Sequence, residues 1–312
     1  MLTVRYGVPQ GSVLGPLLFL CYLKGLPELV SDFGGCLYLY ADDANLVITG
    51  NNQEHIEIKS LINLSVSQQF FVERNLLVNA QKTNFIQFCC NQARFKINPL
   101  IQIDDKELSQ VYSTKFLGLV IDKHLSWNDH VDHVVKKVSS GTYALFRMSK
   151  LCNIDSLKLI YFSMIQSHIT YGICIYGATS KLNLDRILRC QMKAIRIMLN
   201  LNWKDSVKHE FVNLQILTVY SLYIQQTILF VKEHSQRSNQ NIHPYNTRHK
   251  YEPCVERHNL ELFKKRTSFA GNKFYKYLPT RIREEYDLKK FKLLLKEYLI
   301  NKPLYSIEEF FG

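Results

Sequence analysis

Residues 37–49 read LYLYADDANLVIT, and in this stretch two runs of strand-forming residues flank a short acidic segment. The pattern predicts a β-hairpin with Asp42 and Asp43 at its tip. Two unpaired carboxylates side by side repel each other, and a bound Mg²⁺ ion, which prefers oxygen ligands, would remove that repulsion. The alternative is an ordinary turn without a ligand, because aspartate is common in turns.

Composition and charge narrow the class of protein. Of the 312 residues, 46% are apolar, which is enough to bury at least one sizeable core. The formal net charge of +12 favours a polyanionic partner, either nucleic acid or anionic lipid. The eight cysteines form no Cys-x-x-Cys pair, and no basic segment followed by an apolar run marks a secretory signal. We therefore expect a reduced, intracellular protein, nuclear or cytoplasmic, that is not secreted.

The apolar stretch 13–22 is interrupted by Gly15-Pro16 and is too short to span a bilayer, so we expect a buried helix and no membrane partner. Ser12 is expected to cap this helix, and the apolar segment continues to about Val30. A capping box is expected at residues 126–129. Periodicity predicts further helices over 56–72, 131–145, 157–167, 185–199, 214–231 and 288–300. Short strands are expected over 85–88, 101–103 and 116–121.

Further motifs surround the acidic hairpin. Residues 40–43 (YADD) resemble the YxDD box of reverse transcriptases. The motifs on either side are similar to those of non-LTR retrotransposon polymerases of the jockey type. They are GVPQGSVLGPLLF over 7–19, NLLVNAQKT over 75–83, Phe116-Leu117-Gly118, LSW over 125–127, Tyr171-Gly172-Ile173 and QMKA over 191–194. The resemblance covers nearly the whole chain and is strongest over residues 7–128.

The resemblance implies an α+β fold. Residues 1–124 would be a truncated right-hand polymerase palm with an antiparallel sheet, and residues 125–235 an α-helical thumb or connection. Residues 236–312 would be a basic C-terminal segment. The implied activity is DNA synthesis from an RNA template, a DNA primer and deoxynucleotides, by phosphoryl transfer with two Mg²⁺ ions.

The resemblance also implies roles for single residues. Asp42 and Asp43 would be catalytic metal ligands, and Lys82 would neutralise or protonate the departing pyrophosphate unless it is an ordinary solvated lysine. The nucleotide and template pocket would be lined by Gln10, Gly11 and Ser12, where Gly11 permits a close backbone approach. The primer end would be gripped by Phe116, Leu117 and Gly118, which are equally compatible with an ordinary buried strand.

One expected part of the site is missing from this sequence. In the family, another aspartate on a strand before the glycine-rich box bridges both metal ions, but only six residues precede Gly7 here and none is acidic. The fingers are absent as well. We therefore expect an N-terminally truncated polymerase that is inactive by itself. The alternative is a non-catalytic, nucleic-acid-binding remnant of a decayed or co-opted transposon.

A basic stripe offers a second kind of site. Helical spacing places four basic residues on one side of a helix: Arg186, Arg189, Lys193 and Arg196. Such a stripe suits the phosphates of a primer–template duplex, and a solvated helix face is the alternative. The C-terminal segment adds Lys264-Lys265-Arg266 and Lys289-Lys290, with Phe274, Tyr275 and Tyr277 between them. That mixture suits nucleic acid or an ordinary amphipathic helix.

Overall fold

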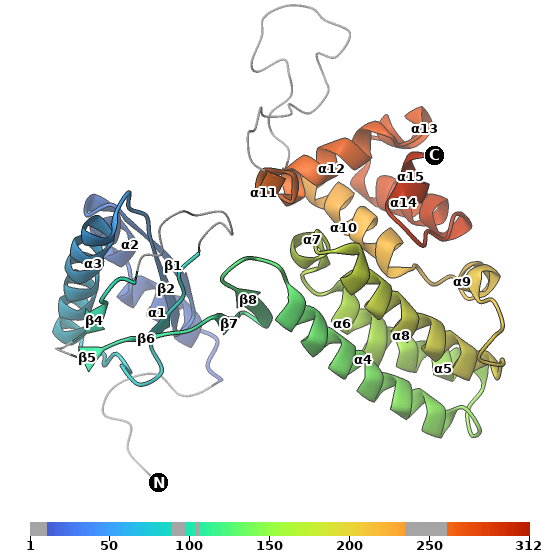
Figure 1. Cartoon of the computed structure of the whole chain (residues 1–312), viewed down its shortest axis with the longest axis horizontal. Helices are drawn as coiled ribbons and strands as arrows, with labels where there is room; N and C mark the ends of the chain where they lie inside the picture. The colour runs from blue at the N-terminus through green and yellow to red at the C-terminus, as the bar shows by residue number, and fades with distance from the viewer. Residues whose placement is uncertain (1–10, 89–97, 104–105, 235–260) are drawn as a thin grey trace, which may run out of the picture. The chain divides into compact units, whose positions relative to one another are not determined.

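The computed structural model describes residues 11–88, 98–103, 106–234 and 261–312, and divides the chain into two compact units, Met1–Tyr112 and Ser113–Gly312 (Figure 1). These described ranges contain helices and four two-stranded sheets, and every element after β8 is helical. This mixture of helices and small sheets confirms the predicted α+β class.

The first unit contains three helices and six strands in its described residues. They are α1 (Gly15–Tyr22), α2 (Leu26–Asp32), β1 (Gly35–Tyr40), β2 (Asp43–Ile48), α3 (Gln53–Glu73), β3 (Asn84–Phe85), β4 (Gln102–Ile103), β5 (Lys106–Glu107) and β6 (Ser109–Gln110). The hairpin β1–β2 and the pair β4–β5 are antiparallel, whereas β3 and β6 are parallel. The acidic hairpin predicted from the sequence is present.

The core of the first unit is small. Its buried apolar cluster consists of Leu23, Leu26, Val30 and Phe70, and alternate residues of the hairpin pack against it. The prediction that the helix within residues 13–22 is buried is wrong. Gly25 turns the chain at φ +96, so two helices form, and Val13, Leu17, Leu18 and Leu20 around α1 are at least half exposed. Because α1 is apolar on every side, a core this small covers little of it.

The second unit is mainly helical. Its elements are β7 (Ser113–Phe116), β8 (Leu119–Asp122), α4 (Asn128–Met148), α5 (Ile154–Tyr161), a π-helical turn (Phe162–Gln166), α6 (Ser167–Thr170), α7 (Ile173–Tyr176), α8 (Lys181–Leu199), α9 (Lys208–Asn213), α10 (Val219–His234), α11 (Glu261–Lys264), α12 (Thr267–Lys276), α13 (Thr280–Arg283), α14 (Leu288–Asn301) and α15 (Glu308–Phe311). Figure 1 shows α4 and α8 side by side, with α10, α12 and α14 beyond them.

Three sequence-based boundaries change in this unit. The strand expected over 116–121 is instead the antiparallel hairpin β7–β8, whose turn is Leu117-Gly118. The helix expected over 214–231 begins only at Val219, because Gln215 adopts φ +59 and breaks it from α9. The C-terminal region contains several short helices besides the predicted one, now α14.

The core of the second unit runs through most of its helices. Tyr161, Tyr176 and Tyr220 are among its largest buried side chains. Buried Gln191 donates to the Tyr161 hydroxyl at 2.9 Å and to the Leu217 carbonyl at 3.2 Å, and accepts from the Val219 amide at 2.7 Å. A buried polar group with all its partners satisfied fixes one packing arrangement, here of α8 against the start of α10.

The loop that leads into α4 is held by a carboxylate of the preceding hairpin. The Asp122 carboxylate accepts from the amides of Trp127 at 2.8 Å, Ser126 at 3.0 Å and His124 at 3.2 Å. The helix N-cap is Trp127, with φ +66 and no side-chain cap. The predicted capping box at 126–129 is therefore wrong: the N-cap is Trp127, one residue after Ser126, and the Asp122 carboxylate binds amides of the loop that leads into the helix. In the described ranges, no helix is long and apolar enough to cross a membrane.

Candidate functional site

The hairpin β1–β2 carries the two candidate metal ligands. Its register pairs Tyr40 with Asp43, so Ala41 and Asp42 form a two-residue turn, with Ala41 at φ +50. Paired residues of an antiparallel ladder project from the same face. Asp43 therefore shares the solvent-facing side of the hairpin with Tyr38 and Tyr40, which are 57% and 65% exposed.

Both carboxylates are exposed at the tip. In the described part of the chain, no cluster of three or more His, Cys, Asp or Glu side chains could hold a metal ion. Asp42 and Asp43 nevertheless supply the oxygen donors that Mg²⁺ prefers, and Mg²⁺ commonly uses only one or two carboxylates and keeps several waters. The pair fits such an ion, which would complete its coordination with water or substrate oxygens.

The glycine-rich segment is described from Gly11 onward, so the predicted pocket residue Gln10 lies outside the described residues. Gly11 has φ +84, and a Cβ there would meet nothing within 4 Å in the chain itself. The backbone conformation is therefore what favours glycine at this position. Ser12 is not the N-cap, which is Leu14, but its Oγ accepts from the Gly15 amide at 3.1 Å.

Lys82 lies in a turn that Asn79 organises. The Asn79 side chain accepts from the Lys82 amide at 3.2 Å, and its carbonyl accepts from the Thr83 amide at 3.1 Å and hydroxyl at 2.9 Å. The Lys82 side chain is exposed. The spacing of asparagine, lysine and threonine in residues 79–83 thus has a local structural cause, and it leaves the ammonium group accessible to a ligand.

Phe116-Leu117-Gly118 meets Tyr171-Gly172, a motif more than fifty residues later in the same unit. The Tyr171 hydroxyl donates to the Leu117 carbonyl, and a Cβ on Gly118 would lie 3.1 Å from the Tyr171 ring. Gly172, at φ +67, lies under Leu119, whose Cδ2 would be 2.6 Å from an added Cβ. Two motifs that the sequence shows separately therefore form one contact that holds the hairpin β7–β8.

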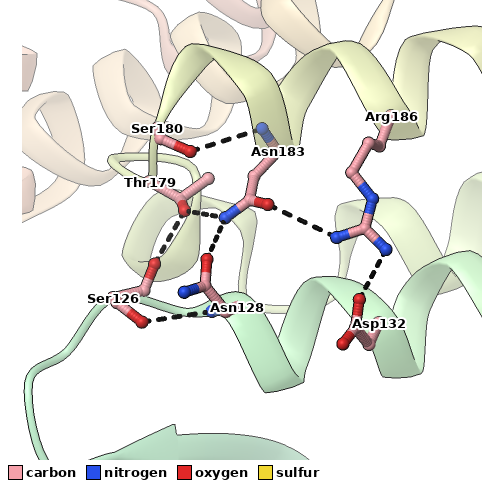
Figure 2. Close-up of polar contacts among 7 residues, drawn as sticks. All are labelled: Ser126, Asn128, Asp132, Thr179, Ser180, Asn183 and Arg186. Carbon is pink, nitrogen blue, oxygen red and sulfur yellow. Dashed lines mark hydrogen bonds and ion pairs between the residues drawn. The ribbon is translucent and has the colours of Figure 1, made fainter.

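The predicted basic stripe does lie along α8, but its members differ in their surroundings. Figure 2 shows Arg186 bound to Asp132 of α4 and to the amide oxygen of Asn183. Arg196 donates to the Asp205 carbonyl at 3.0 and 3.1 Å. Arg189 and Lys193 are exposed. Arg186 and Arg196 therefore connect α8 to other parts of the unit, whereas Arg189 and Lys193 face solvent.

The contacts around Arg186 belong to a polar network between the starts of α4 and α8 (Figure 2). Asn183 donates to Asn128 Oδ1 at 2.7 Å and to Thr179 Oγ1 at 2.9 Å, and Thr179 donates to the Ser126 carbonyl at 2.8 Å.

The aromatic residues of the C-terminal segment are also partly structural. Phe274 is buried against Tyr223 in edge-to-face geometry, so it cannot stack on a base, whereas Tyr277 is 55% exposed.

Two histidines on α4 were not found by sequence reasoning. His130 is buried, and its Nδ1 accepts from the Val120 amide at 3.2 Å. Burial, with a contribution from nearby His133, lowers the pKa of His130 to about 4. Burial also lowers the pKa of His133, helped by repulsion from Lys115, Lys137, His168 and Lys136. Only the His-x-x-His spacing could have indicated that the two rings lie near each other.

Residues 2–121 match the reverse transcriptase (RNA-dependent DNA polymerase) family. This part of the chain, which holds the acidic hairpin, the Lys82 turn and most of the hairpin β7–β8, is reverse transcriptase sequence of the non-LTR retrotransposon type.

The curated relatives agree with this assignment. The chain is 28% identical over 226 residues to a probable RNA-directed DNA polymerase from transposon X-element of Drosophila melanogaster, covering 70% of this chain and 24% of the relative. It is 26% identical over 217 residues to the RNA-directed DNA polymerase from mobile element jockey of Drosophila funebris, covering 64% and 22%. The chain thus spans about a quarter of these relatives' length. No solved structure matches it significantly.

Proposed function

We propose that this chain is the reverse transcriptase part of a non-LTR retrotransposon protein and that Asp42 and Asp43 hold Mg²⁺ for DNA synthesis on an RNA template. The observation that carries the proposal is the acidic hairpin. It places two adjacent carboxylates at an exposed tip, within a segment that matches the reverse transcriptase family. Exposed carboxylates with free coordination positions suit metal ions that must also bind substrate phosphates.

The other site residues have supporting roles in this proposal. Residues 10–12 would line the nucleotide and template pocket, and the exposed Lys82 ammonium would offset charge on the departing pyrophosphate. The turn Phe116-Leu117-Gly118 would contact the primer end. Residues 1–124 would act as palm, residues 125–235 as thumb or connection, and residues 236–312 as a basic extension.

Two carboxylates are fewer ligands than a two-ion site uses. In a mechanism that depends on electrostatic stabilisation of the transition state, the loss of a ligand costs several orders of magnitude in rate. We therefore expect the 312-residue polypeptide by itself to extend no primer. In that form it would bind nucleic acid without catalysis, as the alternative of a non-catalytic remnant also requires.

Primer extension tests the proposal. The 312 residues are joined to the segment that precedes the matched region in the X-element relative, and Mg²⁺-dependent extension of a DNA primer on an RNA template is measured. Asp42→Asn should reduce the rate by at least about a hundredfold, because the amide keeps the shape but loses the charge. Asp32→Asn, on an exposed aspartate at the end of α2, is the matched control and should leave the rate unchanged. Equal rates for Asp42→Asn and Asp32→Asn would contradict the proposal.

A further inference from the structure

A second basic surface, distinct from the stripe on α8, surrounds His133. Lys136 and Lys137 follow His133 by three and four residues on α4, so they lie on the same side of that helix. Lys115 of β7 and His168 of α6, a helix in contact with α4, also act electrostatically on this histidine. All four of these neighbours are exposed, and His133 is half-buried among them. We call these five residues the His133 cluster.

Little negative charge compensates the His133 cluster. Asp132, the acid next to His133 on α4, is bound by Arg186 from α8 (Figure 2). Asp129 lies one turn earlier, in the first turn of α4, where a carboxylate favours the helix N-terminus. In the described residues, no ion pair involves Lys115, Lys136 or Lys137. Repulsion among fixed cations is thus left for an external anion to relieve.

We propose that the His133 cluster binds the phosphate backbone of a nucleic acid, and that binding strengthens as the pH falls because His133 gains a proton in the complex. The choice of nucleic acid over other polyanions rests on the proposed function. It is also favoured by the arrangement of the cluster, because cations from three elements can meet successive phosphates.

The structure favours this surface over the predicted stripe on α8. Arg186 and Arg196 are held by Asp132 and by the Asp205 carbonyl, so binding phosphate would require them to break or share those contacts. The lysines of the His133 cluster have no such contacts to lose. A phosphate can therefore bind these lysines without breaking an existing contact.

The direction of the pH effect follows from the groups that face His133. Burial disfavours the charged form of His133, and repulsion from Lys115, Lys137, His168 and Lys136 disfavours it further. The pKa of free His133 is therefore lowered, so its protonation is disfavoured before phosphate binds. A bound phosphate would favour the imidazolium, so the complex takes up a proton and is tighter at lower pH. Neighbouring His130 stays neutral because burial holds its pKa near 4.

Fluorescence anisotropy of a labelled RNA–DNA duplex with the 312-residue chain tests the proposal at pH 7.5 over a range of KCl. The double variant Lys136→Glu/Lys137→Glu should bind at least about tenfold more weakly, and the salt slope should fall by about two, one phosphate contact for each lysine. Lys296→Glu/Lys302→Glu changes the net charge equally, at two exposed lysines in and just after α14, and should cost less than about threefold. Equal losses in the two variants would show that only net charge matters and would overturn the proposal.

A second arm tests His133. Wild-type affinity should rise about five- to tenfold between pH 7.5 and pH 6.0, since one unit of pKa shift corresponds to a factor of ten. His133→Gln should keep the affinity at pH 7.5 but lose most of that rise, and an unchanged rise would overturn the role of His133. Tighter binding of phosphatidylserine vesicles than of duplex through Lys136 and Lys137, or no binding of duplex by the wild-type chain, would overturn the choice of partner. Circular dichroism melting confirms that each variant is folded.

These outcomes are separable from the proposed function. Primer extension depends on Asp42 in the joined polypeptide, whereas the anisotropy experiment needs only the 312-residue chain and no catalysis. Duplex binding that depends on Lys136 and Lys137 would support the His133 cluster even if no extension were seen.

Discussion

The two units of this chain use their apolar residues in opposite ways. The first unit has a four-residue buried cluster and leaves apolar side chains such as Leu17 and Leu18 half exposed. The second buries apolar residues from most of its helices in one continuous core. The candidate metal ligands lie on the first unit, and the larger basic surfaces lie on the second. The candidate metal ligands are thus exposed side chains on a lightly packed unit, whereas the large buried core lies in the helical unit.

The largest effect on stability is expected in the core of the second unit. Leu184→Ala removes a fully buried side chain of α8 and should lower the free energy of unfolding by about 2–5 kcal/mol. Leu182→Ala, two residues earlier and 67% exposed, should cost less than about 0.5 kcal/mol. Urea unfolding followed by the fluorescence of buried Trp127 measures both. Similar losses for the two variants would contradict a tightly packed core around α8 in the second unit.

The hydrogen bonds to Asp122 should give the next largest effect. Asp122→Ala leaves the amides of His124, Ser126 and Trp127 without their acceptor and should cost about 2 kcal/mol at pH 7. Asp129→Ala, on an exposed carboxylate of α4, is the control and should cost clearly less.

The same hydrogen bonds predict a pH dependence. Burial alone would raise the pKa of Asp122, but the hydrogen bonds from Ser126 and Trp127 outweigh it and lower the pKa. A lowered folded pKa gives stability that is complete above the unfolded value of about 3.9 and is lost as the pH falls through the folded value. The stability difference between wild type and Asp122→Ala should therefore shrink in acid. A constant difference from pH 7 to pH 2 would contradict this cause.

A smaller effect is expected where the two motifs meet. Tyr171→Phe removes the hydroxyl that donates to the Leu117 carbonyl and should cost about 1 kcal/mol. Tyr143→Phe, on an exposed tyrosine of α4, should be neutral in the same urea titration. If both substitutions are neutral, the hairpin β7–β8 is held by packing around Gly118 and Gly172 alone.

The acidic hairpin could be predicted from the sequence because its pattern is local. Strand-forming runs on either side of Asp42-Asp43 fix both the element and its tip. The helix α8 could be predicted for the same reason, since its period spans nineteen residues. Lys82 was assigned by resemblance, and only the structure shows that Asn79 builds its turn.

Other features depend on contacts between distant residues, and periodicity does not report these. Residues 116–121 were expected to form one strand because they are almost all apolar, and this pattern does not reveal the turn at Leu117-Gly118 of the hairpin β7–β8. The hydrogen bonds to Asp122 lie outside the pattern of a capping box, and the ties of Arg186 and Arg196 come from α4 and from Asp205. The sequence of one helix does not show which of its basic side chains are bound to residues of another element.

Terbium luminescence tests the central claim most directly, because it asks whether the tip of the acidic hairpin binds a cation in the 312-residue chain. Tb³⁺ binds oxygen ligands as Mg²⁺ does, and it emits when an excited tyrosine lies close; Tyr40 is paired with Asp43 in the hairpin register. We predict a saturable signal that Mg²⁺ displaces, that Asp42→Asn/Asp43→Asn abolishes and that Asp32→Asn preserves. An unchanged Mg²⁺-sensitive signal in the double variant would contradict the assignment of this hairpin as the metal site.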